Sequence, residues 1–139
     1  MSSLGSDDKT STEQLRSNKL HVLVVDDDDD IRFLMAQILR NEGYCVTEAA
    51  SGREAEELAL VQTPDLVLMD IGMPGEDGLT SVWRLRGRPE LAEVPVVIVS
   101  AYDSYDLRAE AAAEGCIGYL TKPLDPVVLR FKVDEILRS

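Results

Sequence analysis

The chain has 139 residues, of which 45% are hydrophobic and 29% are charged, and this composition is typical of one soluble globular domain with a core of its own. Its formal net charge of −12 disfavours direct binding to nucleic acid, because the phosphates would be repelled, and favours a cation or a basic protein surface as partner. No segment approaches the roughly 18 apolar residues of a membrane span, and the polar N-terminus is unlike a signal peptide. Residues 1–18 lack apolar periodicity and are predicted to form a mobile polar tail ahead of a single domain over residues 19–139.

Strand and helix patterns then alternate five times along the chain. The first helical pattern is an apolar stripe at i, i+3, i+4, i+7 and i+8 that begins at Ile31, includes Leu34 and ends at Leu39. The predicted strands are residues 21–25, 44–49, 65–69, 94–100 and 116–120, of which 44–49 alternates like an edge strand. The predicted helices are residues 31–42, which end at the turn of Gly43, and residues 51–62, 79–86, 103–114 and 126 to the C-terminal end. The helix over 79–86 is predicted from the apolar residues Leu79, Val82, Trp83 and Leu85.

Three of these helices carry recognisable start or stop signals. Ser51 with Glu54 three residues later forms a capping box at the start of the second helix. Asp125 is predicted to be the N-cap of the last helix, with Pro126 at the first helical position that proline favours. Gly115 ends the alanine-rich helix before it.

The alternation of strands and helices predicts βαβ units, and therefore a parallel sheet with helices on both faces. Five such units in a chain of this length suit a flavodoxin-like, doubly wound (βα)5 fold with strand order 2-1-3-4-5. The first and third strands are then neighbours at the topological switch point, and ligands bind there, outside the carboxyl ends of the strands. The place of the ligand site therefore follows from the alternation of strands and helices alone.

Polar side chains follow the inner strands of the predicted sheet. Asp26 and Asp27 follow the first strand, Asp70 the third, Ser100 the fourth and Lys122 the fifth. Asp70 ends the run DLVLMD, and an ionised carboxylate beside a buried strand needs a partner or a function. Three close carboxylates repel one another unless a cation lies among them, and their hard oxygen ligands suit Mg²⁺.

A metal alone leaves the hydroxyl and the ammonium group without a role. A phosphoryl group explains both, because its anionic oxygens are shared between Mg²⁺, Lys122 and Ser100. An aspartate such as Asp70 is itself able to accept that group as an aspartyl phosphate.

Other polar residues have simpler interpretations. Asp28, Asp29 and Asp30 continue the acidic run and are predicted to cap a helix N-terminus and interact with its dipole. His21 opens a strand with no metal-ligand cluster at the right spacing. Cys45 and Cys116 are predicted to be small buried hydrophobic residues, and the absence of a disulfide framework favours a reducing cytoplasm.

Four separated stretches in the order LVVDDD, LVLMDIGMPGEDGL, VVIVSA and GYLTKPL resemble the receiver domain of bacterial two-component response regulators, over about residues 20–138. The resemblance implies a phosphoprotein of phosphorelay signalling that takes a phosphoryl group from a sensor histidine kinase or a histidine phosphotransfer protein. It implies that the protein is not a dedicated enzyme, although it catalyses its own phosphorylation and its slow dephosphorylation. A downstream target is expected on the surface of residues 103–114, 116–120 and the last helix, and the protein is expected to be a monomer or a phosphorylation-dependent dimer.

The same resemblance assigns roles to single residues. The implied Mg²⁺ ligands are the carboxylates of Asp26, Asp27 and Asp70 and the backbone carbonyl of Gly72. The implied catalytic residues are Asp70, which is the phosphoacceptor, Ser100 and Lys122. Ser100 and Tyr119 are the implied switch residues, with Tyr119 turning inward on phosphorylation, and the Lys122–Pro123 bond is expected to be cis.

Three positions depart from the family pattern. Gly72 and Tyr102 stand two residues after Asp70 and Ser100, where the family often has side chains that reach the attacking water, and Ile117-Gly118 replaces a polar pair. Slow loss of the phosphoryl group is therefore expected.

Two other functions stay open, a haloacid-dehalogenase-type phosphohydrolase and a degenerate receiver that acts only as a scaffold. The first should carry a second aspartate at position 72, and the second should have lost an acid or the lysine.

Overall fold

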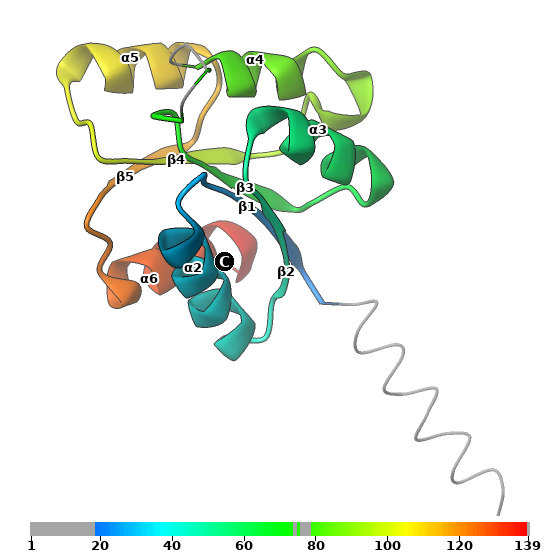
Figure 1. Cartoon of the computed structure of the whole chain (residues 1–139), viewed down its shortest axis with the longest axis vertical. Coiled ribbons are helices and arrows are strands. Elements are labelled where there is room, and N and C mark those ends of the chain that lie inside the picture. The colour runs from blue at the N-terminus through cyan, green and yellow to red at the C-terminus, as the bar shows by residue number, and fades with distance from the viewer. Residues whose placement is uncertain (1–18, 74, 76–78, 139) are drawn as a thin grey trace, which may run out of the picture.

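The computed structural model describes residues 19–73, 75 and 79–138, so the predicted tail over residues 1–18 lies outside the described residues. Five parallel strands form one sheet in the order β2-β1-β3-β4-β5 (Figure 1). The strands are β1 (His21–Val25), β2 (Cys45–Ala49), β3 (Leu66–Met69), β4 (Val96–Ser100) and β5 (Gly118–Thr121). The helices are α2 (Asp29–Asn41), α3 (Gly52–Val61), α4 (Thr80–Arg86), α5 (Tyr105–Ala113) and α6 (Pro126–Arg138), with a 3-10 turn η1 (Pro89–Leu91) before β4. The predicted flavodoxin-like, doubly wound fold is confirmed.

The strands differ in burial as their positions in the sheet require. Every residue of β1, β3 and β4 is buried, because helices cover both faces of the inner strands. β2 is an edge strand, as predicted, and only its last residue, Ala49, is fully buried. Val25 pairs with both Ala49 and Met69 in the register of the sheet, so the carboxyl ends of β1 and β3 lie side by side.

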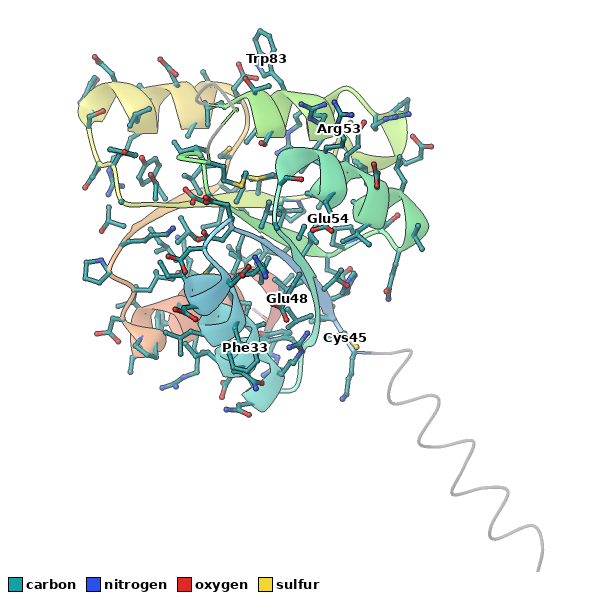
Figure 2. The ribbon with its side chains drawn as sticks, viewed as in Figure 1. Phe33, Cys45, Glu48, Arg53, Glu54 and Trp83 are labelled. Atoms are coloured by element: carbon teal, nitrogen blue, oxygen red, sulfur yellow. The ribbon has the colours of Figure 1, made fainter. Side chains whose placement is uncertain are left out.

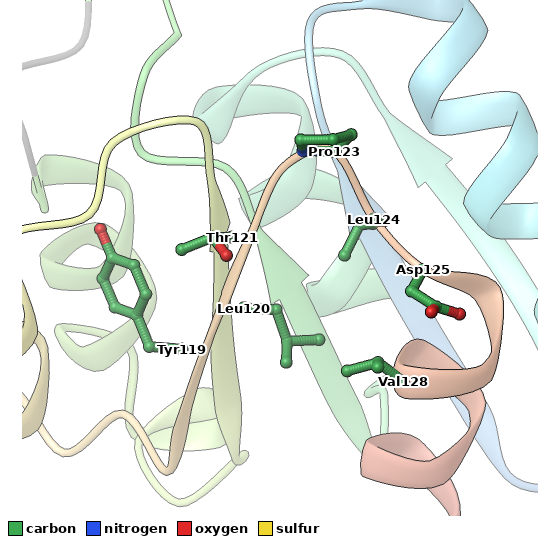
Figure 3. A pocket seen from close by; sticks show the side chains of 7 residues that line it. All are labelled: Tyr119, Leu120, Thr121, Pro123, Leu124, Asp125 and Val128. Atoms are coloured by element: carbon green, nitrogen blue, oxygen red, sulfur yellow. The ribbon is translucent and has the colours of Figure 1, made fainter.

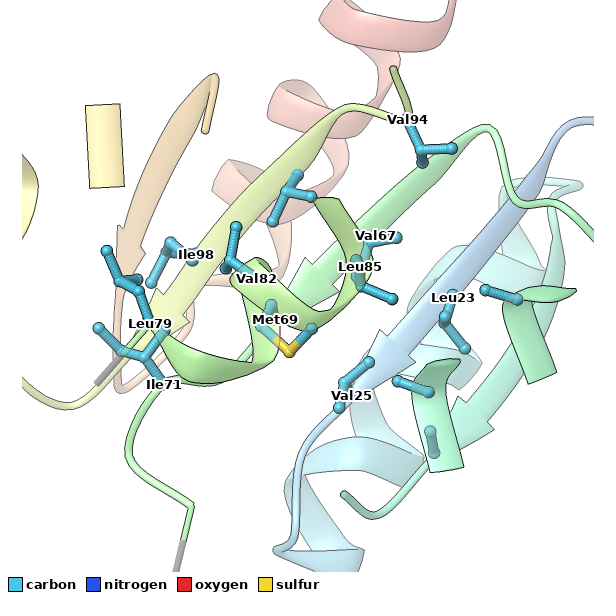
Figure 4. Packing of buried hydrophobic residues seen from close by; sticks show 14 of the residues in the cluster. Leu23, Val25, Val67, Met69, Ile71, Leu79, Val82, Leu85, Val94 and Ile98 are labelled. Carbon is cyan, nitrogen blue, oxygen red and sulfur yellow. The ribbon is translucent and has the colours of Figure 1, made fainter. Parts of the chain in front are cut away.

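Two apolar layers hold the helices on the sheet. On one face α3, α4 and α5 pack on the sheet, and Figure 4 shows Val82 and Leu85 of α4 over Val67 and Met69 of β3. On the other face lie α2 and α6 (Figure 1). The fully buried residues that these two helices contribute are Met35, Ala36, Leu39, Leu129 and Val133.

The predicted helix signals are present as contacts. Ser51 Oγ accepts a hydrogen bond from the amide of Glu54 at 3.1 Å, and Glu54 Oε1 accepts one from the amide of Ala50 at 2.6 Å, one residue before the N-cap. Asp125 Oδ1 accepts a hydrogen bond from the amide of Val127 at 2.8 Å at the start of α6. Gly115 follows α5 at a φ of +85°, a conformation that an L side chain disfavours.

Two apolar side chains of the predicted helix patterns lie in solvent instead of the core. Leu34 is 52% exposed and Trp83 is 65% exposed, and Figure 2 shows Trp83 pointing away from the sheet. The stripe of α2 is wider than the surface that the sheet covers, and Leu34 instead lines a groove with Pro123 and Leu124. The seven-residue α4 buries Ser81, Val82 and Leu85 and leaves the Trp83 side outward.

Further differences concern the cysteines and two element boundaries. Cys45 and Cys116 are half-buried rather than buried, since Cys45 begins the edge strand and Cys116 lies before β5. α5 begins at Tyr105 and not at residue 103, because Ser104 Oγ caps the helix by accepting a hydrogen bond from the amide of Leu107 at 3.1 Å. β5 begins later than predicted because the amide of Cys116 donates to the α5 carbonyl of Ala111.

Candidate functional site

Three carboxylates meet where β1 and β3 end. Asp26 is fully buried, Asp70 is 5% exposed and Asp27 is exposed at the rim. The amide of Asp70 donates to the carbonyl of Val25 at 3.0 Å, which continues the parallel ladder and brings the two acidic strand ends together. One oxygen from each of the three carboxylates lies within 4.8 Å of the others. The convergence predicted from the strand ends is therefore present.

Lys122 crosses from the end of β5 to two of these acids. Its Nζ lies 2.7 Å from Asp26 Oδ2 and 3.2 Å from Asp70 Oδ2. Burial alone would lower the pKa of Lys122, but the hydrogen bonds and the negative charges of Asp26 and Asp70 raise it above its ordinary value. The Lys122–Pro123 peptide bond is cis, as expected from the family resemblance.

Backbone amides fix the other oxygen of each buried acid. The amide of Asp28 donates to Asp26 Oδ1 at 2.9 Å, and the amide of Gly72 donates to Asp70 Oδ1 at 2.8 Å. Oδ2 of both acids thus faces Lys122. Burial nevertheless raises the pKa of Asp26 above its ordinary value, because the hydrogen bonds from Lys122 and the Asp28 amide offset only part of the desolvation. The buried site favours a cation beside these acids.

The remainder of the acidic run caps α2, as predicted. Asp28 Oδ1 accepts hydrogen bonds from the amides of Asp30 and Ile31 at 3.0 and 3.1 Å. Asp29 lies in the first turn and forms an ion pair with Arg32, at 2.7 Å from Nη2. Arg32 also donates from Nη1 to the backbone carbonyl of Asp26 at 2.9 Å, a contact that the sequence interpretation missed. An arginine one turn after an acidic run was the available signal.

Ser100 and Tyr119 are linked through one loop residue. The fully buried Ser100 accepts a hydrogen bond at Oγ from the amide of Tyr102 at 3.0 Å. The Tyr119 hydroxyl donates to the carbonyl of the same Tyr102 at 2.5 Å. Burial raises the pKa of the Tyr119 hydroxyl above its ordinary value. Figure 3 shows Tyr119 on the opposite side of β5 from Leu120, and its ring packs against the core on that side. The Tyr119 ring is therefore half-buried, with its hydroxyl bonded to the loop after β4.

The ring of Tyr102 lies over Gly72. A Cβ placed on Gly72 would come within 3.1 Å of Tyr102 Cε2 and 3.5 Å of Asp70 Oδ1. The edge of the aromatic ring thus packs tightly against the place that a Cβ at position 72 would take, beside the Asp70 carboxylate. Each of these two positions stood out in the sequence, but their contact depends on the path of two loops and was missed.

The donor set fits a hard divalent cation. Asp26, Asp27 and Asp70 offer carboxylate oxygens on one side of the crevice, and the exposed position of Asp27 leaves that side open to solvent. Mg²⁺ prefers this combination of one or two carboxylates with retained waters. The role of the Gly72 carbonyl as a further ligand stays a prediction.

No helix of the described residues is long and apolar enough to span a membrane.

Comparison with known proteins identifies the family. The family model of the response regulator receiver domain matches residues 22–134. Sporulation initiation phosphotransferase F of Bacillus subtilis is 34% identical over 116 residues, which cover 84% of this chain and 92% of that protein. Response regulator PleD of Caulobacter vibrioides is 37% identical over 118 residues, but these are 84% of this chain and only 26% of PleD. The chemotaxis protein CheY4 of Vibrio cholerae superposes with a TM-score of 0.81 at 31% identity, over 86% of this chain and 99% of that structure. The chain therefore belongs to the response regulator receiver domain family, whose members are phosphorylation-dependent signalling switches.

Proposed function

We propose that this receiver domain accepts a phosphoryl group on Asp70 in a Mg²⁺-dependent reaction and changes conformation to regulate a partner. The observation that carries the proposal is the position of Lys122, whose Nζ lies between buried carboxylates from two different strand ends. A lysine held there serves a structural ion pair, but it also stands ready for an anionic phosphoryl oxygen on Asp70.

The phosphodonor is a phosphohistidine of a sensor histidine kinase or of a histidine phosphotransfer protein. An Asp70 oxygen attacks phosphorus, the phosphorus–nitrogen bond breaks and the imidazole leaves with the electron pair. Asp70 is suited to this step because the end of a buried strand and the Gly72 amide hold its carboxylate in one orientation. Asp26, Asp27 and Asp70 would hold Mg²⁺, which when bound would neutralise the charge that develops on the phosphoryl oxygens.

Lys122 and Ser100 complete the proposed phosphoryl site. Lys122 moves its ammonium group from the Asp70 oxygen to a phosphoryl oxygen, over a small distance because it already contacts Asp70. Ser100 offers its hydroxyl from the neighbouring strand, where it now accepts from the Tyr102 amide. Rearrangement of this hydroxyl changes the hydrogen bonding of Tyr102 and, through its carbonyl, of Tyr119.

The proposed output surface is formed by α5, β5 and α6. Its apolar part is a groove beside β5 with exposed side chains of α6, formed by Tyr119, Leu120, Val127, Val128 and Phe131. Because Tyr119 lines this groove and is also bonded to the loop that reaches Ser100, it connects the phosphoryl site with this surface.

A reducing cytoplasm suits the two free cysteines. A monomer or a phosphorylation-dependent dimer is the proposed oligomeric state.

The two alternative functions have weaker support. A haloacid-dehalogenase-type phosphohydrolase needs an acidic side chain where this chain has Gly72. A degenerate receiver should have lost part of the site, whereas both buried acids and Lys122 are present and in contact.

Intact mass spectrometry tests the proposal directly. We expect incubation with acetyl phosphate and Mg²⁺ to add the mass of one phosphoryl group to the wild type, and to add none without divalent metal or in Asp70→Asn. Asp30→Asn is the matched control, because it removes the same charge from an exposed position in the first turn of α2. Equal mass gain in Asp70→Asn and wild type would refute the assignment of the phosphoacceptor.

A further inference from the structure

The β4–α5 loop, residues 101–104, places the Tyr102 ring against Gly72, whose amide holds the Asp70 carboxylate. Tyr102 is 63% exposed, yet the edge of the ring is so close to Gly72 that it would have to move by a few tenths of an ångström to admit a Cβ there. A Cβ on Gly72 would also lie 3.5 Å from Asp70 Oδ1. A shift of this loop would therefore change the packing beside Gly72 and, next to it, Asp70 Oδ1.

Three contacts hold this loop in place. The Tyr102 amide and carbonyl are bonded to Ser100 Oγ and to the Tyr119 hydroxyl, respectively. The third contact is made by Asp103, whose two carboxylate oxygens accept from Arg108 Nε at 2.6 Å and from Arg108 Nη2 at 3.2 Å. Such a two-point pair fixes the orientation of the guanidinium group as well as its position.

The guanidinium group of Arg108 also covers the ring of Tyr119. Its Cζ lies 4.7 Å from the ring centroid, which is the distance of a cation–π contact. Arg108 therefore joins the first turn of α5, the loop and β5. The rest of α5 gives little anchorage, because Ala111 is the only fully buried residue among its nine.

A purely stabilising role explains this arrangement poorly. The side chains of Arg108 and Asp103 are 47% and 46% exposed, and an ion pair of that exposure contributes little to folding stability. The effect of the pair is thus local, on the position of the loop and of the Tyr119 ring.

We propose that Arg108 is a positioning residue that, through Asp103 and Tyr119, holds the Tyr102 ring over Gly72 and so lengthens the life of the phosphoryl group on Asp70. The inference rests on the proposed function. In the reaction concerned, a water oxygen attacks phosphorus, the bond between phosphorus and the Asp70 oxygen breaks, and inorganic phosphate leaves while the water proton passes to solvent. The ring lies beside the site and limits the entry of water. By thermodynamic linkage, a partner that contacts Arg108 or Tyr119 changes the stability of this covered state.

The decay of purified phosphoprotein tests the role of Arg108. We expect Arg108→Ala to speed the decay severalfold and Arg108→Lys to lie between that variant and the wild type, because lysine keeps a cation near Asp103 and the ring. Arg53→Ala on α3 is the matched control, since Arg53 is exposed and lies on a helix remote from the loop. If Arg108 acts through Tyr102, Arg108→Ala adds nothing to the faster decay of Tyr102→Ala, and independent multiplication of the two effects would overturn the proposal.

Amide hydrogen exchange of the unphosphorylated, metal-free protein gives a second readout. We expect faster exchange over residues 101–107 in Arg108→Ala and no change in Arg53→Ala. Faster exchange with an unaltered phosphoryl lifetime would show a structural contact only and would overturn the proposed role, as would unaltered exchange. A wild type that takes up no phosphoryl group would refute the proposed function itself, and the lifetime role with it, whereas the exchange experiment would still show whether Arg108 holds the loop.

Discussion

At the scale of single residues, the site was predictable where strand ends determine it. Asp26 and Asp70 directly follow buried strands and Lys122 follows β5, and the order of a doubly wound sheet brings those ends together, so their contacts follow from the pattern. The packing of Tyr102 on Gly72 was not predictable in this way. It depends on backbone angles in two loops, for which hydrophobic periodicity gives no information.

A residue prediction concerns the pH dependence of stability through His21. Burial lowers the pKa of His21 below 6.5, against smaller opposing effects of a backbone hydrogen bond at Thr63 and of Asp65. The unfolded chain therefore takes up a proton at His21 before the folded protein does, and this part of the stability is present above pH 6.5 and is lost as the pH falls below it. The loss is at most about 1.4 kcal/mol per pH unit.

Urea unfolding at about pH 7.5 and about pH 5.5 measures this effect. We expect the free energy of unfolding of the wild type to fall more between these two values than that of His21→Gln, which cannot titrate. The difference between the two proteins isolates His21 from the carboxylates. An identical fall in both would contradict the role of this histidine.

A second residue prediction concerns the lifetime of the phosphorylated state. Hydrolysis needs a water in line with phosphorus, and Gly72 has no side chain to orient it. We expect Gly72→Asn and Tyr102→Glu to speed the decay, by an amount on the order of 10²-fold if the new side chain positions water well. The new Cβ in Gly72→Asn must also displace the Tyr102 ring slightly.

Gly72→Ala separates these two causes. It displaces the ring but offers no polar group, so we expect it to speed the decay less than Gly72→Asn does. Rates are compared on purified phosphoprotein under the same conditions. Slower decay in Gly72→Asn or Tyr102→Glu than in the wild type would contradict the expectation that a water-orienting group is missing.

At the scale of elements, helix starts were predictable where a side chain caps them. Ser51 and Asp125 begin α3 and α6 as their sequence signals indicate. The start of α5 was placed at Asp103 although Ser104 is the cap, since both residue types cap helices equally well. The exposed side of α4 was not predictable, because seven residues are too few to define an apolar stripe.

The acidic run at the start of α2 gives a prediction for a single element. Asp28 caps two amides of the first turn, whereas Asp30 supplies only a charge near the helix N-terminus. We expect Asp28→Ala to lower the free energy of unfolding by about 1 kcal/mol. We expect Asp30→Ala to lower it by only about 0.3 kcal/mol, from the lost dipole interaction. Urea denaturation of the two variants compares these values, and equal losses would show that charge, not capping, is what Asp28 contributes.

At the scale of the whole molecule, the sequence pattern was sufficient for the fold and for the place of the site. Five strand–helix units and short connections leave few alternatives to a doubly wound sheet, and the confirmed order puts the acidic ends of β1 and β3 side by side. The hydrogen bond from the Tyr119 hydroxyl to the Tyr102 carbonyl was not predictable, because it depends on the path of the loop after β4. The inward turn of Tyr119 on phosphorylation stays a prediction.

The two hydrogen bonds of Tyr102, with Ser100 and with Tyr119, lead to a prediction for the switch as a whole. In the proposed switch, a phosphoryl group on Asp70 draws the Ser100 hydroxyl from the Tyr102 amide, and the change should pass along the β4–α5 loop into α5, in which only Ala111 is fully buried. We expect beryllofluoride with Mg²⁺ to alter amide exchange over residues 103–120, most strongly in α5, and to leave β1 unchanged because it lies fully buried in the sheet. Asp70→Asn treated in the same way should show no change. Unaltered exchange throughout residues 103–120 in a wild type that binds beryllofluoride would identify the chain as a scaffold and not a switch.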